Sequence, residues 1–243
     1  MQDRFADRRI AVVGAAGGIG SAICALLLEE GATVYGLDRQ GIDSMPEGVT
    51  GIAMDLTDEA SVAAVVERLY RSDPSPVSLV NSAGIVENDV AAEAMPMDLF
   101  DRVMAVNLRG VYLTCRDFGA ALLEHGGGAI VNIASMSGNA VVNVPQRQSV
   151  YNSSKAAVTA LTRSLAVEWG ARGVRVNAVS PGYVDTPLNA LKTTMHGEWL
   201  GRTPLGRFGR VEEVAAAVAY LLSDEAAFCQ GTELLLDGGY SLV

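Results

Sequence analysis

The hydrophobic residues of this chain fall into short continuous runs, separated by longer stretches with helical spacing. Runs that are apolar at every position are typical of strands buried on both faces of a sheet. The longer stretches repeat apolar residues every three to four positions, as helices do. The pattern predicts strands at residues 10–13, 33–37, 49–54, 77–80, 129–133, 174–179 and 234–236. It predicts helices at residues 19–30, 58–70, 97–123, 151–169 and 211–222.

The alternation of strand and helix along the whole chain indicates an α/β fold. A strand, a helix and a second strand in succession favour parallel pairing, with helices on both faces of the sheet. We therefore predict a doubly wound, mostly parallel sheet of seven strands. The chain has 243 residues and shows no internal repeat, and its proline-containing stretch at 72–77 is too short to separate domains. A single domain over residues 1–243 is expected.

The least regular stretch lies between residues 187 and 210, which contain Met195, His196 and Trp199. In open α/β sheets, ligands bind beyond the carboxyl ends of the strands, and this stretch follows the sixth predicted strand. We expect residues 187–210 to form a lid over a substrate. The alternative is an ordinary surface loop.

The charge balance narrows the function. Twenty-eight Asp and Glu residues against 18 Lys and Arg residues leave a net charge of −10. This balance argues against binding to nucleic acid or to an anionic membrane, both of which need a basic face. The N-terminus lacks the apolar stretch of a signal peptide, and no apolar run approaches the length of a membrane span. A cytoplasmic protein is expected.

Residue types that bind metals are few and scattered. The cysteines Cys24, Cys115 and Cys229 are far apart, and the chain has two histidines, so no metal site is predicted. Core or interface thiols in a reducing compartment are the simpler interpretation. Only Lys155 and Lys192 among the 18 basic residues are lysines, which suggests a specific use for an ammonium group.

A glycine-rich turn, VGAAGGIG, follows the first predicted strand. Gly14 permits a tight turn, Gly18 lets backbone amides approach a pyrophosphate, and Gly20 lets the next helix pack closely. Asp38 ends the second strand, 18 residues beyond Gly20, where a carboxylate can accept hydrogen bonds from an adenosine ribose. These features together predict a dinucleotide site, against the alternative of a glycine turn without a ligand.

Asp38 also bears on which dinucleotide binds. Its carboxylate would repel the 2′-phosphate of NADP, and loop residues 15–17 offer no cation, so we predict NAD. Arg39 could instead reach a phosphate or stack on adenine. Small and polar residues at other strand ends extend the predicted site, although each could equally belong to a turn. These further candidates are Ile19, Asp55, Leu56, Asn81, Ala83 and Gly84.

Candidate catalytic residues follow later in the chain. Tyr151 and Lys155 are four residues apart at the start of a predicted helix and project from one face. A phenol is a poor base at neutral pH, and a neighbouring ammonium stabilises the phenolate. A solvent-reaching lysine at an amphipathic helix start would give the same pair. Ser135 ends the fifth strand, and Asn107 is a polar residue in an apolar helix, where it indicates a kink or a bound water.

These motifs resemble the short-chain dehydrogenase/reductase family over essentially the whole chain. VGAAGGIG resembles its glycine motif, NSAG at 81–84 its Asn-Asn-Ala-Gly, SPGYVDT at 180–186 its nicotinamide segment, and DGG at 237–239 its C-terminal motif. Val13 and Ser82 depart from the usual Thr and Asn. The residues that match the catalytic tetrad are Asn107, Ser135, Tyr151 and Lys155. The resemblance adds the cofactor contacts Pro181, Gly182, Val184 and Thr186.

The resemblance implies a Rossmann-type fold and an enzyme that transfers a hydride between NAD and a secondary alcohol or ketone. Tyr151 would be the general acid and base, and Lys155 would lower its pKa and bind the nicotinamide ribose. Ser135 would orient the reacting oxygen, and Asn107 would position a water in the proton relay. The resemblance also implies a homotetramer, with the helical faces at 105–122 and 156–169 in subunit contacts unless they are core.

The substrate is indicated by the interval from Ser135 to Tyr151. Its 16 residues exceed the commonest arrangement in the family, and its sequence resembles that of the sugar-alcohol dehydrogenases. Ser137, Asn143 and Gln146 offer hydrogen bonds to hydroxyl groups, although a polar loop that satisfies its own backbone would look the same. We expect a polyol or another carbinol with a polar substituent.

Two other functions stay open. One is a 3-oxoacyl-thioester reductase of the same family. Asp38 weakens this reading because reductive biosynthesis uses NADPH, and the acidic surface would repel an acidic carrier protein. The other is a non-catalytic sensor protein that binds a dinucleotide, which the full set of four catalytic residues disfavours.

Overall fold

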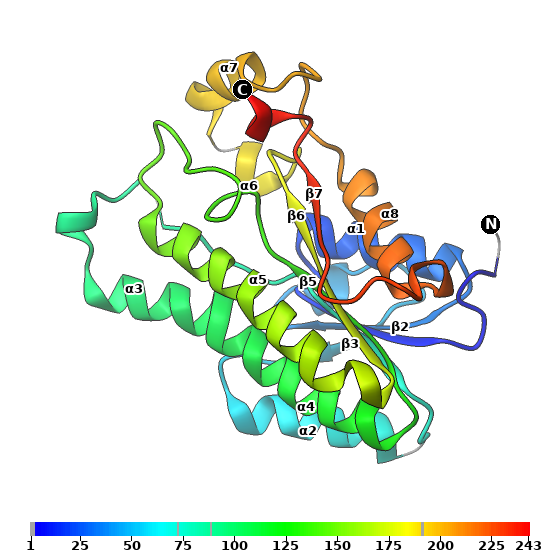
Figure 1. The fold of residues 1–243 in the computed structure, drawn as a ribbon. Coiled ribbons are helices and arrows are strands. Elements are labelled where there is room, and N and C mark those ends of the chain that lie inside the picture. The colour runs from blue at the N-terminus through cyan, green and yellow to red at the C-terminus, as the bar shows by residue number, and fades with distance from the viewer. Residues whose placement is uncertain (1–2, 72, 88, 191) are drawn as a thin grey trace.

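Seven strands form one sheet in the computed structural model, which describes residues 3–71, 73–87, 89–190 and 192–243 (Figure 1). The strand order is β3-β2-β1-β4-β5-β6-β7, and every adjacent pair is parallel. The strands are β1 (Arg9–Val13), β2 (Thr33–Asp38), β3 (Thr50–Ala53), β4 (Val77–Asn81), β5 (Gly128–Ile133), β6 (Val174–Pro181) and β7 (Glu233–Leu236). All seven predicted strands are confirmed to within two residues, and the sheet is parallel throughout rather than mostly so.

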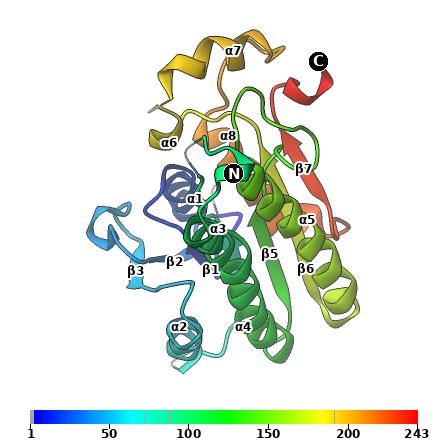
Figure 2. The same ribbon diagram turned by 90° about the vertical axis from the view of Figure 1, so that its left-hand side faces the viewer.

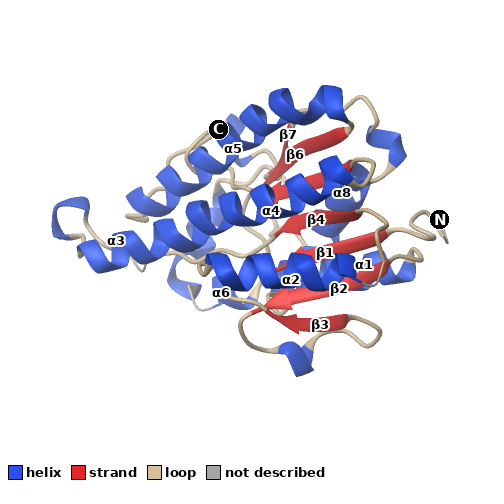
Figure 3. Ribbon diagram, turned by 90° about the horizontal axis from the view of Figure 1, so that it is seen from below, coloured by secondary structure: helices blue, strands red, loops and turns tan. Residues whose placement is uncertain are grey.

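Helices cover both faces of the sheet. The helices are α1 (Gly18–Glu29), α2 (Glu59–Arg71), α3 (Met97–Met104), α4 (Val111–Glu124), α5 (Ser149–Trp169), α6 (Pro187–Ala190), α7 (His196–Gly201) and α8 (Val211–Leu222). α1 packs against α8 on one face, while α2, α4 and α5 cover the other (Figure 3). Within the described residues, no helix combines the length and apolar character needed to cross a lipid bilayer.

The continuous apolar strands have a direct structural explanation. Every residue of β1 is buried. Ile10 and Val12 pack into the core beneath α1 and α8, whereas Ala11 and Val13 pack into the core beneath α2, α4 and α5. Successive side chains of a strand point to opposite faces, so a strand between two helical layers needs apolar residues at every position.

The helix predicted at residues 97–123 changes character in its middle. A π-helical segment, η3 (Ala105–Gly110), separates α3 from α4. Asn107 lies inside this segment and is fully buried. π-helical turns occur where a side chain must be placed against the regular helical repeat, frequently at functional sites. The local irregularity expected at Asn107 is therefore present.

Residues 187–210 are more regular than the sequence pattern indicated. They contain α6, the 3₁₀ turn η5 (Thr193–Met195) and α7. Figure 2 shows α6 and α7 beyond one end of the sheet. Trp199 of α7 is completely buried and stacks on Tyr183, with 4.1 Å between the ring centroids. This aromatic contact anchors the segment to the chain that follows β6, and its role as a lid stays a prediction.

Candidate active site

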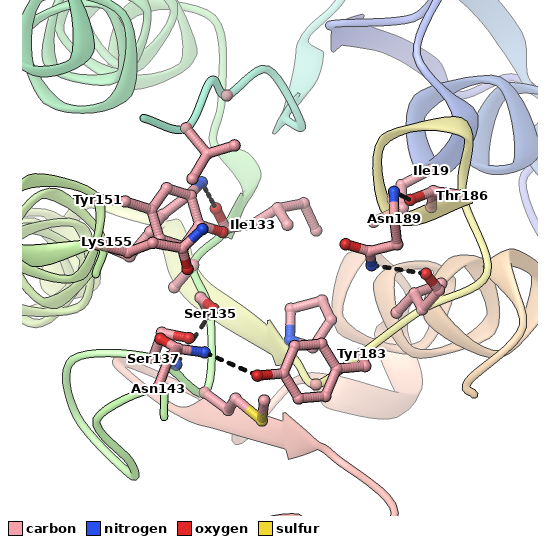
Figure 4. A pocket seen from close by; sticks show the side chains of 18 of the residues that line it. Ile19, Ile133, Ser135, Ser137, Asn143, Tyr151, Lys155, Tyr183, Thr186 and Asn189 are labelled. Atoms are coloured by element: carbon pink, nitrogen blue, oxygen red, sulfur yellow. Dashed lines mark hydrogen bonds between the residues drawn. The ribbon is translucent and has the colours of Figure 1, made fainter. Parts of the chain in front are cut away.

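Two adjoining cavities lie at the carboxyl ends of the central strands. The long cavity, of about 530 Å³, follows the glycine turn after β1 and reaches Asp38 and Asp55. The small cavity, of about 160 Å³, lies beside Tyr151 and Tyr183 (Figure 4). The residues that line both cavities are Ser82, Gly84, Ile85 and Val86. The two cavities therefore form one continuous groove.

The glycine turn brings two loops into contact along the long cavity. Gly14 has a φ of 81°, and a Cβ there would lie 2.6 Å from the Ala83 backbone nitrogen. A Cβ at Gly20 would lie 2.1 Å from the Gly14 carbonyl oxygen. Only glycine fits either position. The tight turn predicted at Gly14 and the close helix packing predicted at Gly20 are both present.

The start of α1 is open to an anion. Its N-cap, Gly17, makes no side-chain capping bond, and the first turn contains no acidic residue. Gly17 also lines the long cavity. The N–H groups of a helical first turn lack partners within the helix, and the helix dipole places partial positive charge there. This end of the helix therefore suits a pyrophosphate.

Asp38 is held at the wall of the long cavity by backbone groups. Its Oδ2 accepts a hydrogen bond from the Ala16 N–H at 3.1 Å, and its Oδ1 accepts one from the Arg39 N–H at 2.7 Å. Both Asp38 and Arg39 line the cavity. Asp55 lies on the same cavity, and hydrogen bonds from Thr57 hold the pKa of its carboxyl below the ordinary value.

An unpartnered hydroxyl at the junction shows that the groove fits a ligand with polar groups. The Ser82 hydroxyl oxygen is buried without a hydrogen-bond partner among the residues described. A buried hydroxyl without a partner is unfavourable, so a ligand that supplies one is stabilised there. The open α1 N-terminus, the Asp38 carboxylate and this hydroxyl together fit a dinucleotide.

Most of the predicted cofactor contacts line the groove. Those that do are Gly14, Ile19, Asp38, Arg39, Asp55, Leu56, Ala83, Gly84, Tyr151, Lys155, Pro181, Gly182, Val184 and Thr186. Gly18 and Gly20 shape the turn without lining it. Asn81 is not brought to the groove. Its side chain points into the core, donates to Asn132 Oδ1 at 2.9 Å and accepts from the Thr114 hydroxyl at 2.8 Å.

The catalytic candidates meet at the small cavity. Tyr151 and Lys155 project from α5, and Ser135 follows β5 (Figure 4). The Lys155 Nζ donates to the Ile133 carbonyl oxygen at 2.7 Å and lies 6.0 Å from the centroid of the Tyr151 ring. A Cβ at Gly84 would lie 3.3 Å from this Nζ, which places the ammonium at the junction of the two cavities.

Asn107 does not reach the groove with its side chain. Its Oδ1 accepts from the Ile85 N–H at 2.8 Å. Its Nδ2 donates to the Ile85 carbonyl at 2.8 Å and to the Ser154 hydroxyl at 3.0 Å. Both amide N–H groups are thus engaged by protein. The side chain fixes the loop after β4, and its predicted contact with a water stays untested.

Burial shifts the pKa values of both titratable catalytic candidates, Lys155 and Tyr151. It lowers the pKa of Lys155 to about 8. Burial also raises the pKa of Tyr151 above its ordinary value; a hydrogen bond with Ser135 lowers that pKa, and the charge of Glu87 raises it. Without a ligand the phenol is therefore harder to ionise than a free tyrosine. The lowering of this pKa that the resemblance implies for Lys155 stays a prediction.

The three predicted substrate contacts lie together in the small cavity. They lie beside Tyr183, which was not predicted to contact the substrate. Ser137, Asn143 and Gln146 all line this cavity. Asn143 Nδ2 donates to the Tyr183 hydroxyl at 3.1 Å (Figure 4). The Tyr183 hydroxyl in turn donates to Gln146 Oε1 at 2.8 Å. Tyr183 lies within the SPGYVDT motif, whose only predicted role was to contact nicotinamide. The sequence feature that could have identified Tyr183 as a site residue is its position directly after β6.

The wall opposite α5 comes from the 187–210 segment. Asn189 and Lys192 both line the small cavity. Asn189 Nδ2 donates to the Val184 carbonyl at 2.8 Å. Burial lowers the pKa of Lys192, while the charges of Glu87 and Asp89 raise it. The scarcity of lysine in the sequence was a signal for Lys192, but it could not place the residue in the site.

Known proteins resemble this chain over nearly its whole length. A family model described as enoyl-(acyl carrier protein) reductase matches residues 14–241. Galactitol 2-dehydrogenase (L-tagatose-forming) from Cereibacter sphaeroides is 44% identical over 245 residues, which cover 96% of this chain and 94% of that protein. Cis-4-hydroxycyclohexanecarboxylate dehydrogenase from Sinomonas cyclohexanicum is 41% identical over 252 residues, which cover 100% of each.

The fold has equally close counterparts among solved structures. The crystal structure of gox2181 matches with a TM-score of 0.92 and 35% sequence identity, and the match covers 99% of each chain. The parallel seven-stranded sheet, the glycine turn and the grouping of Ser135, Tyr151 and Lys155 agree with these matches. This chain belongs to the short-chain dehydrogenase/reductase family, and it is an oxidoreductase that uses a nicotinamide dinucleotide.

Proposed function

We propose that this protein catalyses reversible hydride transfer between NAD and a secondary alcohol that carries a second polar group, such as a polyol. The observation that carries this proposal is an unpartnered acceptor in the small cavity. Asn143 is 5% exposed, and its Oδ1 is buried without a hydrogen-bond partner within the described part of the chain. The Asn143 Nδ2 is already engaged by Tyr183. The cavity therefore favours a substrate with a donor for this oxygen.

The protein side of the reaction follows from the geometry. Tyr151 removes the proton of the carbinol in oxidation and returns it in reduction. Ser135, which lines the small cavity with Tyr151, orients the reacting oxygen. Lys155 places a positive charge at the junction of the two cavities. An oxidised nicotinamide held in the groove would supply the hydride acceptor for this reaction.

The names of the relatives support a substrate with more than one polar group. Galactitol is a polyol, and hydroxycyclohexanecarboxylate joins a ring carbinol to a carboxylate. In this chain the small cavity presents Ser137, Asn143 and Gln146 beside the catalytic residues. A second hydroxyl on the substrate would meet Asn143 Oδ1 as the first meets Ser135 and Tyr151.

Replacing Asn143 with alanine tests this substrate class. We expect the ratio of kcat/KM for butane-2,3-diol to that for butan-2-ol to fall by about 5- to 30-fold, which corresponds to about 1–2 kcal/mol for one unmet hydrogen bond. Val142→Ala is the matched control because Val142 lies on the same loop and is 75% exposed. If butan-2-ol is the better substrate of the wild type and Asn143→Ala leaves the ratio unchanged, the loop has no role in recognition.

The choice of NAD is tested by replacing Asp38 with alanine. This change removes both the repulsion of a 2′-phosphate and an acceptor for the ribose hydroxyls. We expect kcat/KM with NADP to rise and kcat/KM with NAD to fall, each by about 1–3 kcal/mol, or roughly 5- to 150-fold. Arg39→Ala is the comparison, because a wild type that prefers NADP and loses this preference in Arg39→Ala would contradict the argument from Asp38.

A thioester reductase is the second candidate, because the matching family model is described as enoyl-(acyl carrier protein) reductase. Three features argue against it. The net charge of −10 would repel an acidic carrier protein, the small cavity contains the polar side chains of Ser137, Asn143 and Gln146, and Asp38 disfavours NADPH. Faster turnover of an acetoacetyl thioester with NADPH than of any diol with NAD would favour this candidate instead.

The proposed enzyme is expected to be a homotetramer. An apolar groove on the surface of α3, η3, α4 and α5 supports self-association. Its lining residues include Met104, Ala105, Leu108, Tyr112 and Leu161. Tyr112 is 49% exposed. An exposed apolar patch is typical of contacts between subunits.

A further inference from the structure

Glu87 is a buried carboxylate that the catalytic chemistry described above does not use. It is 0% exposed. Its Oε1 accepts hydrogen bonds from the Val150 N–H at 2.9 Å and from the Tyr151 N–H at 3.1 Å, and its Oε2 accepts from the Tyr151 N–H at 3.1 Å. A buried charge is unfavourable unless it is hydrogen-bonded, so these contacts hold the carboxylate in place.

The helix that carries Tyr151 has no cap of its own. Gln148, the N-cap of α5, makes no side-chain capping bond, and the first turn of the helix contains no acidic residue. The N–H groups of a first helical turn need acceptors from outside the helix. Glu87 supplies them from the loop after β4, and its negative charge lies favourably at the positive end of the 21-residue helix.

The loop that carries Glu87 is itself fixed. Two residues earlier, the Ile85 N–H and carbonyl are both bound by the side chain of Asn107, at 2.8 Å each. Asn107 also binds Ser154 of α5. The loop after β4, the π-helical segment and the start of α5 thus form one connected unit beside the groove. Within this unit Glu87 accepts from the backbone N–H of Tyr151, and the Ser154 hydroxyl donates to the Tyr151 carbonyl at 2.7 Å.

We propose that Glu87 is a positioning residue. Its carboxylate fixes the first turn of α5 and thereby holds the Tyr151 phenol in its place at the groove. The proposal rests on the proton-transfer role of Tyr151 in the proposed function. Small displacements of a reacting group can lower rates about 100-fold. Loss of the Glu87 contacts should therefore lower kcat much more than it changes KM for NAD, because the glycine turn and Asp38 at the long cavity lie on other loops.

The charge of Glu87 adds a second, separable effect. It raises the pKa of Tyr151, together with burial and against the hydrogen bond from Ser135. Charged groups near Glu87 in the described part of the chain are Lys192 on the 187–210 segment and Asp89, which forms an ion pair with Arg147 at 3.0 Å. An uncharged side chain of the same shape would keep an acceptor for the two N–H groups and remove the charge.

The test compares Glu87→Ala with Glu87→Gln. We expect Glu87→Ala to lower kcat for the wild-type enzyme's best secondary alcohol by roughly 10- to 100-fold, with KM for NAD changed by less than about threefold. Glu87→Gln should recover most of kcat and move the pH at which kcat/KM rises to a lower value, because the phenol ionises more easily beside an amide. Asp58→Ala, which removes the side-chain acceptor for the Ala60 N–H at α2, is the matched control.

Amide hydrogen exchange gives a readout that needs no substrate. The Val150 and Tyr151 amides should exchange faster in Glu87→Ala than in Glu87→Gln or the wild type. Equal exchange and an unchanged kcat in Glu87→Ala would overturn the proposal. If Glu87→Ala does not fold, an unchanged kcat/KM profile against pH in Glu87→Gln would overturn it. A wild type that oxidises no secondary alcohol contradicts the proposed function, while the exchange experiment still decides the role of Glu87.

Discussion

Replacing Tyr151 with phenylalanine is expected to lower kcat for alcohol oxidation by at least about 100- to 10,000-fold, the usual contribution of a general acid or base. The phenol lines the small cavity with Ser135 and is the proposed acceptor of the carbinol proton. The glycine turn and Asp38 lie in the long cavity and are unchanged by the substitution. Affinity for NADH, measured by fluorescence titration, should therefore stay near that of the wild type.

The pH dependence of kcat/KM separates this role from a structural one. Oxidation needs the phenolate, and burial raises the pKa of Tyr151, so the wild-type rate should rise with pH over the alkaline range. Tyr151→Phe should lose both the rate and this rise. Tyr220→Phe on α8 is the control, because Tyr220 is 37% exposed and lies outside the groove. A Tyr151→Phe enzyme with near wild-type kcat would contradict the assignment.

Replacing Lys155 with methionine should lower kcat by about 100-fold or more and raise KM for the cofactor, because both cavities meet at its ammonium. Methionine keeps most of the buried stem but offers no charge to the phenolate and no donor to a ribose. Steady-state kinetics with NAD and the best secondary alcohol measure both effects. Lys192→Met removes the other lysine and should leave KM for NAD near its wild-type value. If Lys192→Met raised KM for NAD as much as Lys155→Met does, this result would contradict a specific role for Lys155.

The same substitution should change how stability depends on pH. Burial lowers the pKa of Lys155 from 10.5 to about 8, so between these pH values the unfolded chain binds more protons than the folded one. The unfolding free energy of the wild type therefore gains with rising pH in this window, by about 3 kcal/mol. Lys155→Met lacks this gain. Urea unfolding of the ligand-free proteins should show the difference, wild type minus variant, increasing from pH 8 to 10.5; a constant difference would contradict the buried ammonium.

The fold could be predicted from local patterns because a strand that is buried on both faces of a sheet is apolar at every position. The apolar runs of β1, β4 and β6 indicated a parallel sheet before any contact was known. The 187–210 segment was less predictable. Its short helices have no long apolar period, and the segment is held by the stacking of Trp199 on Tyr183, two residues from separate parts of the chain.

The candidate site residues that line the small cavity could be predicted because they carry local signals. Tyr151 and Lys155 share one helical face, and Ser135 and the glycine turn each follow a strand whose end the apolar pattern marks. Asn81 shows the limit of this reasoning. Its place at a strand end suited a cofactor contact, but buried partners at Thr114 and Asn132 engage its side chain instead.

The sequence by itself determined the order of strands and helices, the dinucleotide turn and the residues able to move a proton, because each depends on neighbours within a few positions. The tertiary structure alone decided which distant groups meet. Glu87 binds the amide of Tyr151 across 64 positions, and Asn143 binds Tyr183 across 40. Such pairs produce no periodic pattern in the sequence, because a hydrogen bond depends on the distance and direction between two groups in space. The contact between Glu87 and the backbone of Tyr151, and the polar side chains grouped in the small cavity, are therefore properties of the folded chain.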